Sequence, residues 1–203
     1  MKVISSASLI IALLFACPVN AQQTVNGCQL KRKTNCPGVN LSGADLTKSN
    51  LSGSDLSGAN LSGSNLSGDK ITEANLIKAN LSNANLSGTN LSETYMTGAN
   101  LSHANFAKAN LSQSSLPDAN LREANLAGAD LSLANLKGAD LTGATAKGAV
   151  FIMTLLTNAN LTRVDLTEAT LTGTDLRNTI LEGTTFCRTT MPDRSINNSG
   201  CPK

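Results

Sequence analysis

Few side chains in this chain of 203 residues could carry chemistry, and its five cysteines are the clearest candidates. Thiols form disulfides or hold metals, and Cys28, Cys36, Cys187 and Cys201 allow three different disulfide pairings. The single histidine, His103, has no cluster of histidines or cysteines near it in sequence, which argues against a catalytic zinc site. No nucleophile–base pair and no phosphate-binding loop is readable either. The sequence therefore argues against an enzyme, and we expect no catalytic, cofactor-binding or metal-binding residue.

The composition is unusual for a globular domain. Aromatic residues make up 2% of the chain and charged residues 15%, with a net charge of +2. The scarcity of aromatic rings means that the core is built from smaller side chains. Without a continuous basic patch, the charge pattern gives no sign of nucleic-acid binding.

The N-terminus has the order of features of an export signal. Lys2 precedes an apolar stretch over residues 3–16, and Val19-Asn20-Ala21, which is small at both ends, precedes Gln22. This pattern predicts a signal peptide over residues 1–21, so the mature chain is expected in the periplasm or secreted, with no membrane span. Two alternatives are a buried N-terminal helix and a lipoprotein attached through Cys17.

A five-residue period runs through most of the remaining chain. Residues at every fifth position from 41 to 186 give thirty centres, and twenty-four of them are Leu. We number the places of each unit one to five, as in residues 59–63. Place one is small, place two is Asn or Asp, place three is the centre, place four is mostly Ser or Thr, and place five is often Gly.

Neither an α-helix nor an ordinary strand explains a strict period of five. The pattern instead predicts short extended sides with a bend at each end, in which places one and three point inward. Four such sides close a coil of twenty residues. Only small residues then fit beside the leucines in so narrow a tube, which explains the missing aromatic residues.

Units such as residues 44–48, 59–63 and 129–133 match the motif A(D/N)Lxx, and the sequence resembles the pentapeptide-repeat family over about residues 39–188. The resemblance implies an all-β fold, a right-handed quadrilateral β-helix. Thirty units at four per coil make about 7.5 coils, or roughly 36 Å. Residues 22–38 and 189–203 are then an N-terminal and a C-terminal cap. Both ends are similar to those of exported and thylakoid-lumen members, so the lumen is a further possible location.

Within such a tube, proximity along the chain favours the disulfides Cys28–Cys36 and Cys187–Cys201, one at each end. Export would preserve them. Free thiols and a metal site are the alternatives, but cysteines at opposite ends could not meet across the tube.

Three departures from the motif stand out. Asp69 occupies an inward place, where the hydroxyls of Ser49 and Thr89 are expected to flank it. An ion or catalytic site is one interpretation, and local polar compensation or a bulge is the other. Pro117 lacks an N–H and is expected to break one ladder hydrogen bond.

The third departure is a run of apolar residues in outward places. We call Leu133, Val150, Ile152, Met153 and Leu155 the apolar patch, and expect it to be an exposed interaction site. A bulge that buries these residues, or a terminal segment that covers them, is an equal alternative.

The favoured function is a non-catalytic structural or protein-interaction scaffold, which binds a protein partner or itself. The alternative is a glycan- or ice-binding surface built from flat Ser/Thr columns. Members of the family that mimic DNA and bind gyrase need a dense negative surface. Residues 39–188 carry ten basic and thirteen acidic side chains, interleaved, which disfavours that function.

Overall fold

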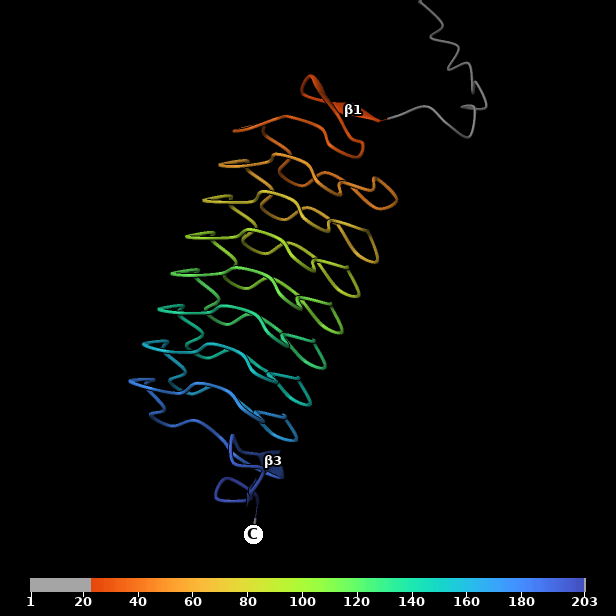
Figure 1. Ribbon diagram of the computed structural model, residues 1–203. Helices are drawn as coiled ribbons and strands as arrows, with labels where there is room; N and C mark the ends of the chain where they lie inside the picture. The colour runs from red at the N-terminus through yellow and green to blue at the C-terminus, as the bar shows by residue number, and fades with distance from the viewer. Residues whose placement is uncertain (1–22, 203) are drawn as a thin grey trace, which may run out of the picture.

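The computed structural model describes residues 23–202, which form one stack of coils with a short hairpin at each end (Figure 1). The expected signal peptide, residues 1–21, lies outside the described residues. The two hairpins are antiparallel pairs of short strands, β1 with β2 and β3 with β4. Their bounds are β1 Thr24–Val25, β2 Cys28–Gln29, β3 Thr189–Thr190 and β4 Ile196–Asn197. No helix occurs within residues 23–202.

Between the hairpins, the sheet consists of single-residue bridges with a spacing of twenty. Each place-two residue except Asn50 pairs in parallel with the residue twenty positions later, from Asn35 with Asp55 to Thr170 with Thr190. Four five-residue units therefore make one coil, as the sequence predicts. Each side contributes only one bridged residue before the chain turns a corner.

One unit shows how the backbone is satisfied. The Asn60 N–H donates to the carbonyl twenty-one residues earlier (2.9 Å), and the N–H groups of Leu61 and Gly63 donate to carbonyls nineteen residues later (2.7 and 2.9 Å). The Ser64 N–H donates to the Leu61 carbonyl (3.1 Å) and closes the corner. The remaining N–H, of Ser62, donates to the Asn60 side chain (3.2 Å). Asn or Asp at place two thus caps the only N–H that neither the ladder nor the corner uses.

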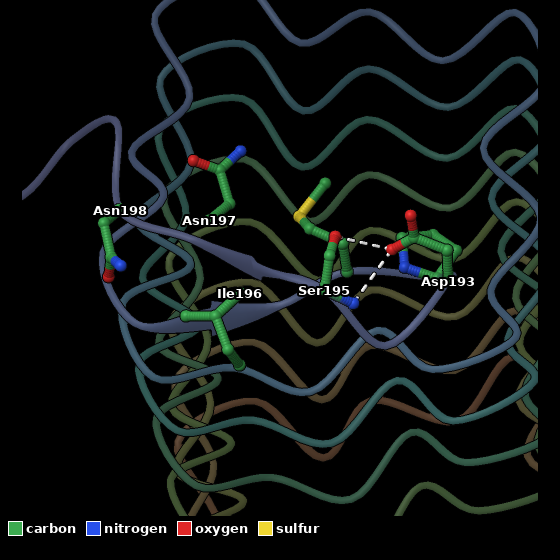
Figure 2. Close-up of a pocket in the computed structure, with 7 residues that line it drawn as sticks. Asp193, Ser195, Ile196, Asn197 and Asn198 are labelled. Atoms are coloured by element: carbon green, nitrogen blue, oxygen red, sulfur yellow. Dashed lines mark hydrogen bonds between the residues drawn. The ribbon is translucent and has the colours of Figure 1, made fainter.

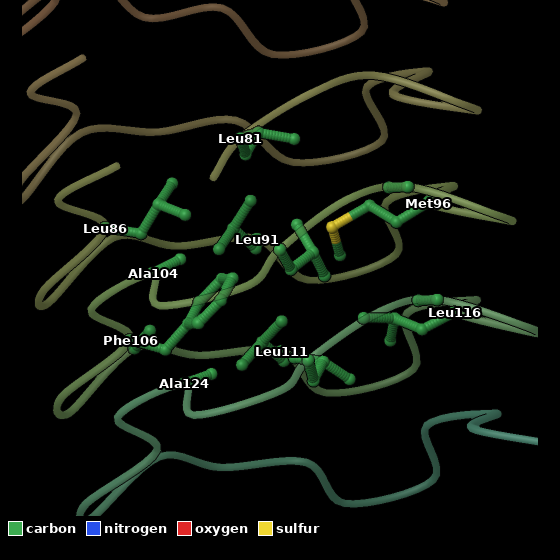
Figure 3. Packing of buried hydrophobic residues seen from close by; sticks show 14 of the residues in the cluster. Leu81, Leu86, Leu91, Met96, Ala104, Phe106, Leu111, Leu116 and Ala124 are labelled. Carbon is green, nitrogen blue, oxygen red and sulfur yellow. The ribbon is translucent and has the colours of Figure 1, made fainter. Parts of the chain in front are cut away.

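The interior is a column of leucines lined by alanines, as predicted. Side chains such as Leu86, Leu91 and Leu111 point into the tube, where Ala104 and Ala124 sit beside the larger Phe106 (Figure 3). These leucines are fully buried, and each contributes about 2 kcal/mol of hydrophobic stabilisation. Because each coil packs only on its neighbours, this stability is spread along the stack.

Every corner places its fifth residue in the left-handed region of backbone space. All thirty place-five residues from Gly43 to Arg188 have a positive φ, and seventeen of them are not glycine. A positive φ at the second central residue, with a hydrogen bond across the turn, is the pattern of a type II turn. No β-branched residue occupies any of these places, because its side chain would clash there.

The expectation for Pro117 was wrong. It lies at place four, whose N–H is capped by a side chain elsewhere and takes no part in the ladder. Proline also suits the first central position of a type II turn. The Pro117 carbonyl still accepts from the Gly98 N–H at 2.9 Å, so no ladder bond is lost.

The expected environment of Asp69 was also wrong. Its Oδ1 accepts from the N–H groups of Asn50 (3.0 Å) and Lys70 (2.8 Å), while Oδ2 and the Ser49 hydroxyl are buried without a partner. The Thr89 hydroxyl bonds instead to a backbone carbonyl. Asn50 has a φ of 48°, and its bridge to Lys70 is missing. The Asp69 carboxylate therefore takes the place of the backbone bridge between Asn50 and Lys70, which agrees with the local-bulge interpretation.

A change at a single corner tests the turn. We predict that Asn83→Thr lowers the free energy of unfolding by about 1–2 kcal/mol, because a β-branched residue is forced to a φ of 59°. Urea denaturation measures the loss. The control Ser82→Thr, one place earlier, should change little, since threonine is common there. Equal effects of the two substitutions would contradict the assigned corner.

A change at Asp69 tests the ladder defect. We predict that Asp69→Ala raises the free energy of unfolding by about 1–3 kcal/mol, because it removes a buried acceptor without a partner and lets Lys70 pair with the previous coil. Thermal melting measures the gain. In the same column, Thr89→Ala should lower stability, since it deletes a satisfied hydroxyl. A loss of stability in Asp69→Ala as large as in the control would refute the interpretation.

Candidate functional site

The apolar patch centres on a corner column that is polar elsewhere. Of the seventeen non-glycine residues at place five, only Leu133 and Met153 are apolar, and they lie one coil apart in the same column. Both hold a positive φ, of 62° and 54°. Two large apolar side chains at corners that otherwise carry glycine or polar residues are a local departure from the fold's own rule.

The patch is exposed and its backbone is regular. Leu133 is 53% exposed, Met153 60%, Ile152 39% and Leu155 36%, while Val150 is half-buried. Val150 keeps both of its bridges to the neighbouring coils. Neither a bulge nor the described terminal residues bury these side chains, so both alternatives considered for the patch are wrong within residues 23–202.

Side chains at place five run along the stack toward the following coil. A Cβ at Gly173 would lie 3.4 Å from Met153 Cγ, and a Cβ at Gly128 would lie 3.6 Å from Lys108 Cγ. Met153 thus lies over the bare Gly173 corner. By the same geometry Leu133 extends toward Met153, which makes the two side chains one continuous surface.

Acidic residues border the patch on its N-terminal side. Asp130 directly precedes Val150 in the column of place two, and Glu73 and Glu93 lie farther along the corner column, beyond Gln113. The Asp130 carboxylate accepts from the Ser132 hydroxyl at 2.6 Å. The surface is therefore an apolar centre with a negative border, which complements an apolar anchor flanked by basic side chains.

The hydroxyl column next to the patch is partly engaged. It consists of residues 52, 72, 92, 112, 132, 152 and 172, and Ile152 interrupts it. The hydroxyls of Ser52 and Ser132 donate to the place-two side chain of their own units (2.9 and 2.6 Å). Two of the six hydroxyls in the column thus already donate within the chain, and Ile152 interrupts the row, so the column is not a continuous hydroxyl surface for a glycan or ice.

The C-terminal hairpin lines an open hollow of about 490 Å³ (Figure 2). The Ser195 hydroxyl and N–H donate to Asp193 Oδ1 at 2.6 and 3.0 Å. These hydrogen bonds hold the pKa of Asp193 below its ordinary value, which makes the carboxylate a weak base. The pair is a turn motif rather than a nucleophile with its base.

His103 is half-exposed at a corner, where its Nδ1 lies 3.4 Å from a carboxylate oxygen of Glu123. Within residues 23–202, no three histidine, cysteine or acidic side chains lie close enough to hold a metal ion. The same residues contain no helix of the length and apolarity that a membrane crossing requires.

The four cysteines lie in the two end caps. The structure joins Cys28 to Cys36 and Cys187 to Cys201. The first bond ties β2 to the degenerate first unit, and the second ties the last unit to the C-terminal tail. Each therefore anchors a terminal segment to the stack.

The sequence analysis did not identify two further exposed apolar residues within the repeat. Tyr95 is 54% exposed and Ile180 is 51% exposed, each at place two of its unit. Both could have been identified from the sequence, because place two is Asn or Asp in most units and an apolar residue there departs from the repeat.

The sequence matches the family model described as pentapeptide repeats, in eight copies, over residues 32–68, 74–113, 104–143, 114–151 and 147–183. No curated protein matches the chain.

Among solved structures, the chain is similar to HetL of Nostoc sp. PCC 7120, a pentapeptide repeat protein involved in heterocyst differentiation regulation. The two sequences are 28% identical, and the match covers 81% of this chain and 90% of HetL, with a TM-score of 0.33. QnrB1, a plasmid-mediated fluoroquinolone resistance protein, is 19% identical over 74% of this chain and 90% of its own (TM-score 0.40). A pentapeptide repeat protein from the Arabidopsis thaliana thylakoid lumen is 31% identical over 57% and 70% (TM-score 0.25). Because the family model matches well over half of the residues, the chain belongs to the pentapeptide-repeat family.

Proposed function

We propose that this protein is an exported, non-catalytic scaffold that presents the apolar patch to a protein partner. The stack is a right-handed quadrilateral β-helix of about 7.5 coils, built from thirty units between caps at residues 22–38 and 189–203. The observation that carries the proposal is the pair of exposed apolar corners, Leu133 and Met153, in a column that is otherwise glycine or polar.

A filled tube suits this role. Its interior is packed with leucine and alanine, so binding must use the outer surface. Because the corners fix the backbone at place five and the coil repeat sets its spacing, the patch is carried on a regular backbone before a partner arrives. A preorganised surface loses little conformational entropy on binding. The acidic border favours a partner with an apolar anchor and basic neighbours.

Substitution at Met153 tests the patch. We predict that Met153→Glu reduces capture of the partner from the native envelope fraction by more than about tenfold, because a charge replaces the apolar anchor. Glutamate already occupies this place at Glu73 and Glu93, so the fold accepts it. The control Asn83→Glu adds the same charge at place five of a different corner column, away from the patch, and should leave capture unchanged.

Mass spectrometry of the captured proteins, followed by titration with the purified partner, supplies the measurement. The same captured proteins and equal affinities for Met153→Glu and the unsubstituted chain would remove the patch from the function.

Export and oxidised caps form the second part of the proposal. We predict that the native chain begins at Gln22 and that its four remaining cysteines resist alkylation until a reductant is added. The paired substitution of Cys187 and Cys201 by serine should lower the free energy of unfolding by about 3 kcal/mol, because it opens a loop of fourteen residues. Intact residues 1–21, or four freely alkylated cysteines, would contradict export.

A further inference from the structure

Methionine thioethers are the groups that a hydroperoxide would oxidise first within residues 23–202. The cysteines in this range are all joined in disulfides, so none of them offers a thiol to an oxidant. Three methionines lie in the same range, Met96, Met153 and Met191. Because a peroxide must reach a lone pair of the sulfur, exposure decides which thioether reacts.

The three methionines differ in exposure. Met96 is a centre of the leucine column and is fully buried, and Figure 3 shows its side chain inside the tube. Met191 is half-buried and packs against the core at the C-terminal end. Met153 is the most exposed large apolar side chain within residues 23–202. Only one thioether is therefore open to solvent, and it belongs to the apolar patch.

The corner that follows Met153 in its column bears no side chain. A Cβ at Gly173 would lie 3.4 Å from Met153 Cγ, so the Met153 side chain lies over a bare corner. The other apolar corner, Leu133, has Met153 at the next corner of its column. Met153 is therefore the exposed C-terminal end of the patch, which a small oxidant can approach from solvent.

We propose that Met153 is an oxidation site, at which a hydroperoxide converts the apolar patch into a polar surface. The inference rests on the proposed function, because it concerns regulation of the same site. A lone pair of the Met153 sulfur attacks the terminal oxygen of the peroxide, an S–O bond forms and the O–O bond breaks. The leaving oxygen takes the proton of the transferred one and departs as water or an alcohol. Sulfur is thus oxidised by two electrons and the peroxide is reduced by two.

The sulfoxide changes what the patch binds. A thioether is an apolar contact, whereas a sulfoxide is polar and its oxygen accepts hydrogen bonds. Because Met153 is exposed, this oxygen binds water, and the apolar anchor of a partner would have to displace that water. Oxidation therefore weakens the contact between Met153 and an apolar anchor.

The fold accepts a polar side chain at this corner. The same column carries Glu73, Glu93 and Gln113 at place five, each with a positive φ. In the core, by contrast, a sulfoxide at Met96 would bury an oxygen among leucines. Oxidation at Met153 thus changes the surface and leaves the stack intact. Methionine sulfoxide reductases, which reduce the sulfoxide, restore the apolar surface.

Treatment of the full mature chain with hydrogen peroxide, followed by peptide mass spectrometry, tests the site. In the folded chain, Met153 should gain one oxygen at least about tenfold faster than Met96 or Met191. In urea the three rates should converge, because unfolding exposes every thioether. Equal rates at Met153 and Met191 in the folded chain would overturn the proposal.

Hydrophobic-interaction chromatography of the folded chain measures the change of the surface without any partner. Peroxide treatment should shorten retention of the unsubstituted chain and of Met191→Leu, but not of Met153→Leu. Leucine already occupies this place at Leu133, so the fold accepts the last substitution. Methionine sulfoxide reductases should restore the retention. Retention that oxidation of Met153 leaves unchanged would refute the change of surface.

Capture of the partner from the native envelope fraction supplies the functional readout. Treatment should reduce capture by more than about fivefold in the unsubstituted chain and by less than about twofold in Met153→Leu, each relative to the untreated chain of the same variant. Capture that survives oxidation of Met153 but not Met153→Glu would also overturn the proposal. Failure is distinguishable from failure of the proposed function, because oxidation rates and retention are measured without a partner.

Discussion

Hydrogen bonding between successive coils is the constraint on which the structure depends. In every coil, some backbone N–H groups donate to carbonyls nineteen residues later, and others donate to carbonyls twenty-one residues earlier. The chain must therefore return to the same direction after twenty residues. A five-residue side with one corner meets this requirement four times per coil. The leucine column follows, because the centre of each side then lies above the centre of the side one coil earlier.

The corner imposes the second constraint. Its fifth residue holds a positive φ, which glycine adopts freely and β-branched residues avoid. This rule permits charged and polar residues of many kinds at the corner, and it gives the stack a surface whose side chains vary while the backbone does not. Function is thus free to change along the corner columns at little structural cost. Leu133 and Met153 are the places where this chain departs from the polar norm.

The sequence was sufficient for the features that repeat. The spacing of Leu41 to Phe186 predicts the coil, the inward places and the core, and the same spacing locates Leu133 and Met153 at one corner. It was insufficient where a single side chain competes with the backbone. Asp69 accepts two backbone N–H groups and removes a bridge, and nothing in the period reveals which donors a buried carboxylate will select.

Pro117 and the last coil show two other limits. The cost of a proline depends on which N–H the ladder uses, and that assignment requires the actual hydrogen bonds. In the last coil, the N–H groups of Leu176 and Leu181 find no acceptor within residues 23–202, because the tail turns back over the side before them and lies outside the repeat. Periodicity therefore predicts what every coil shares, whereas the ends are decided by contacts that occur once.

Residue-resolved amide hydrogen exchange tests the coil-on-coil ladder most directly. In the central coils, place-three amides donate to backbone carbonyls at the centre of the sheet, whereas place-four amides donate only to a side chain. The expected result is protection that repeats every five residues, with slow exchange at Leu101 and Leu121 and faster exchange at Ser102 and Arg122. Protection without a five-residue period, or with place four as the slowest, would contradict the ladder.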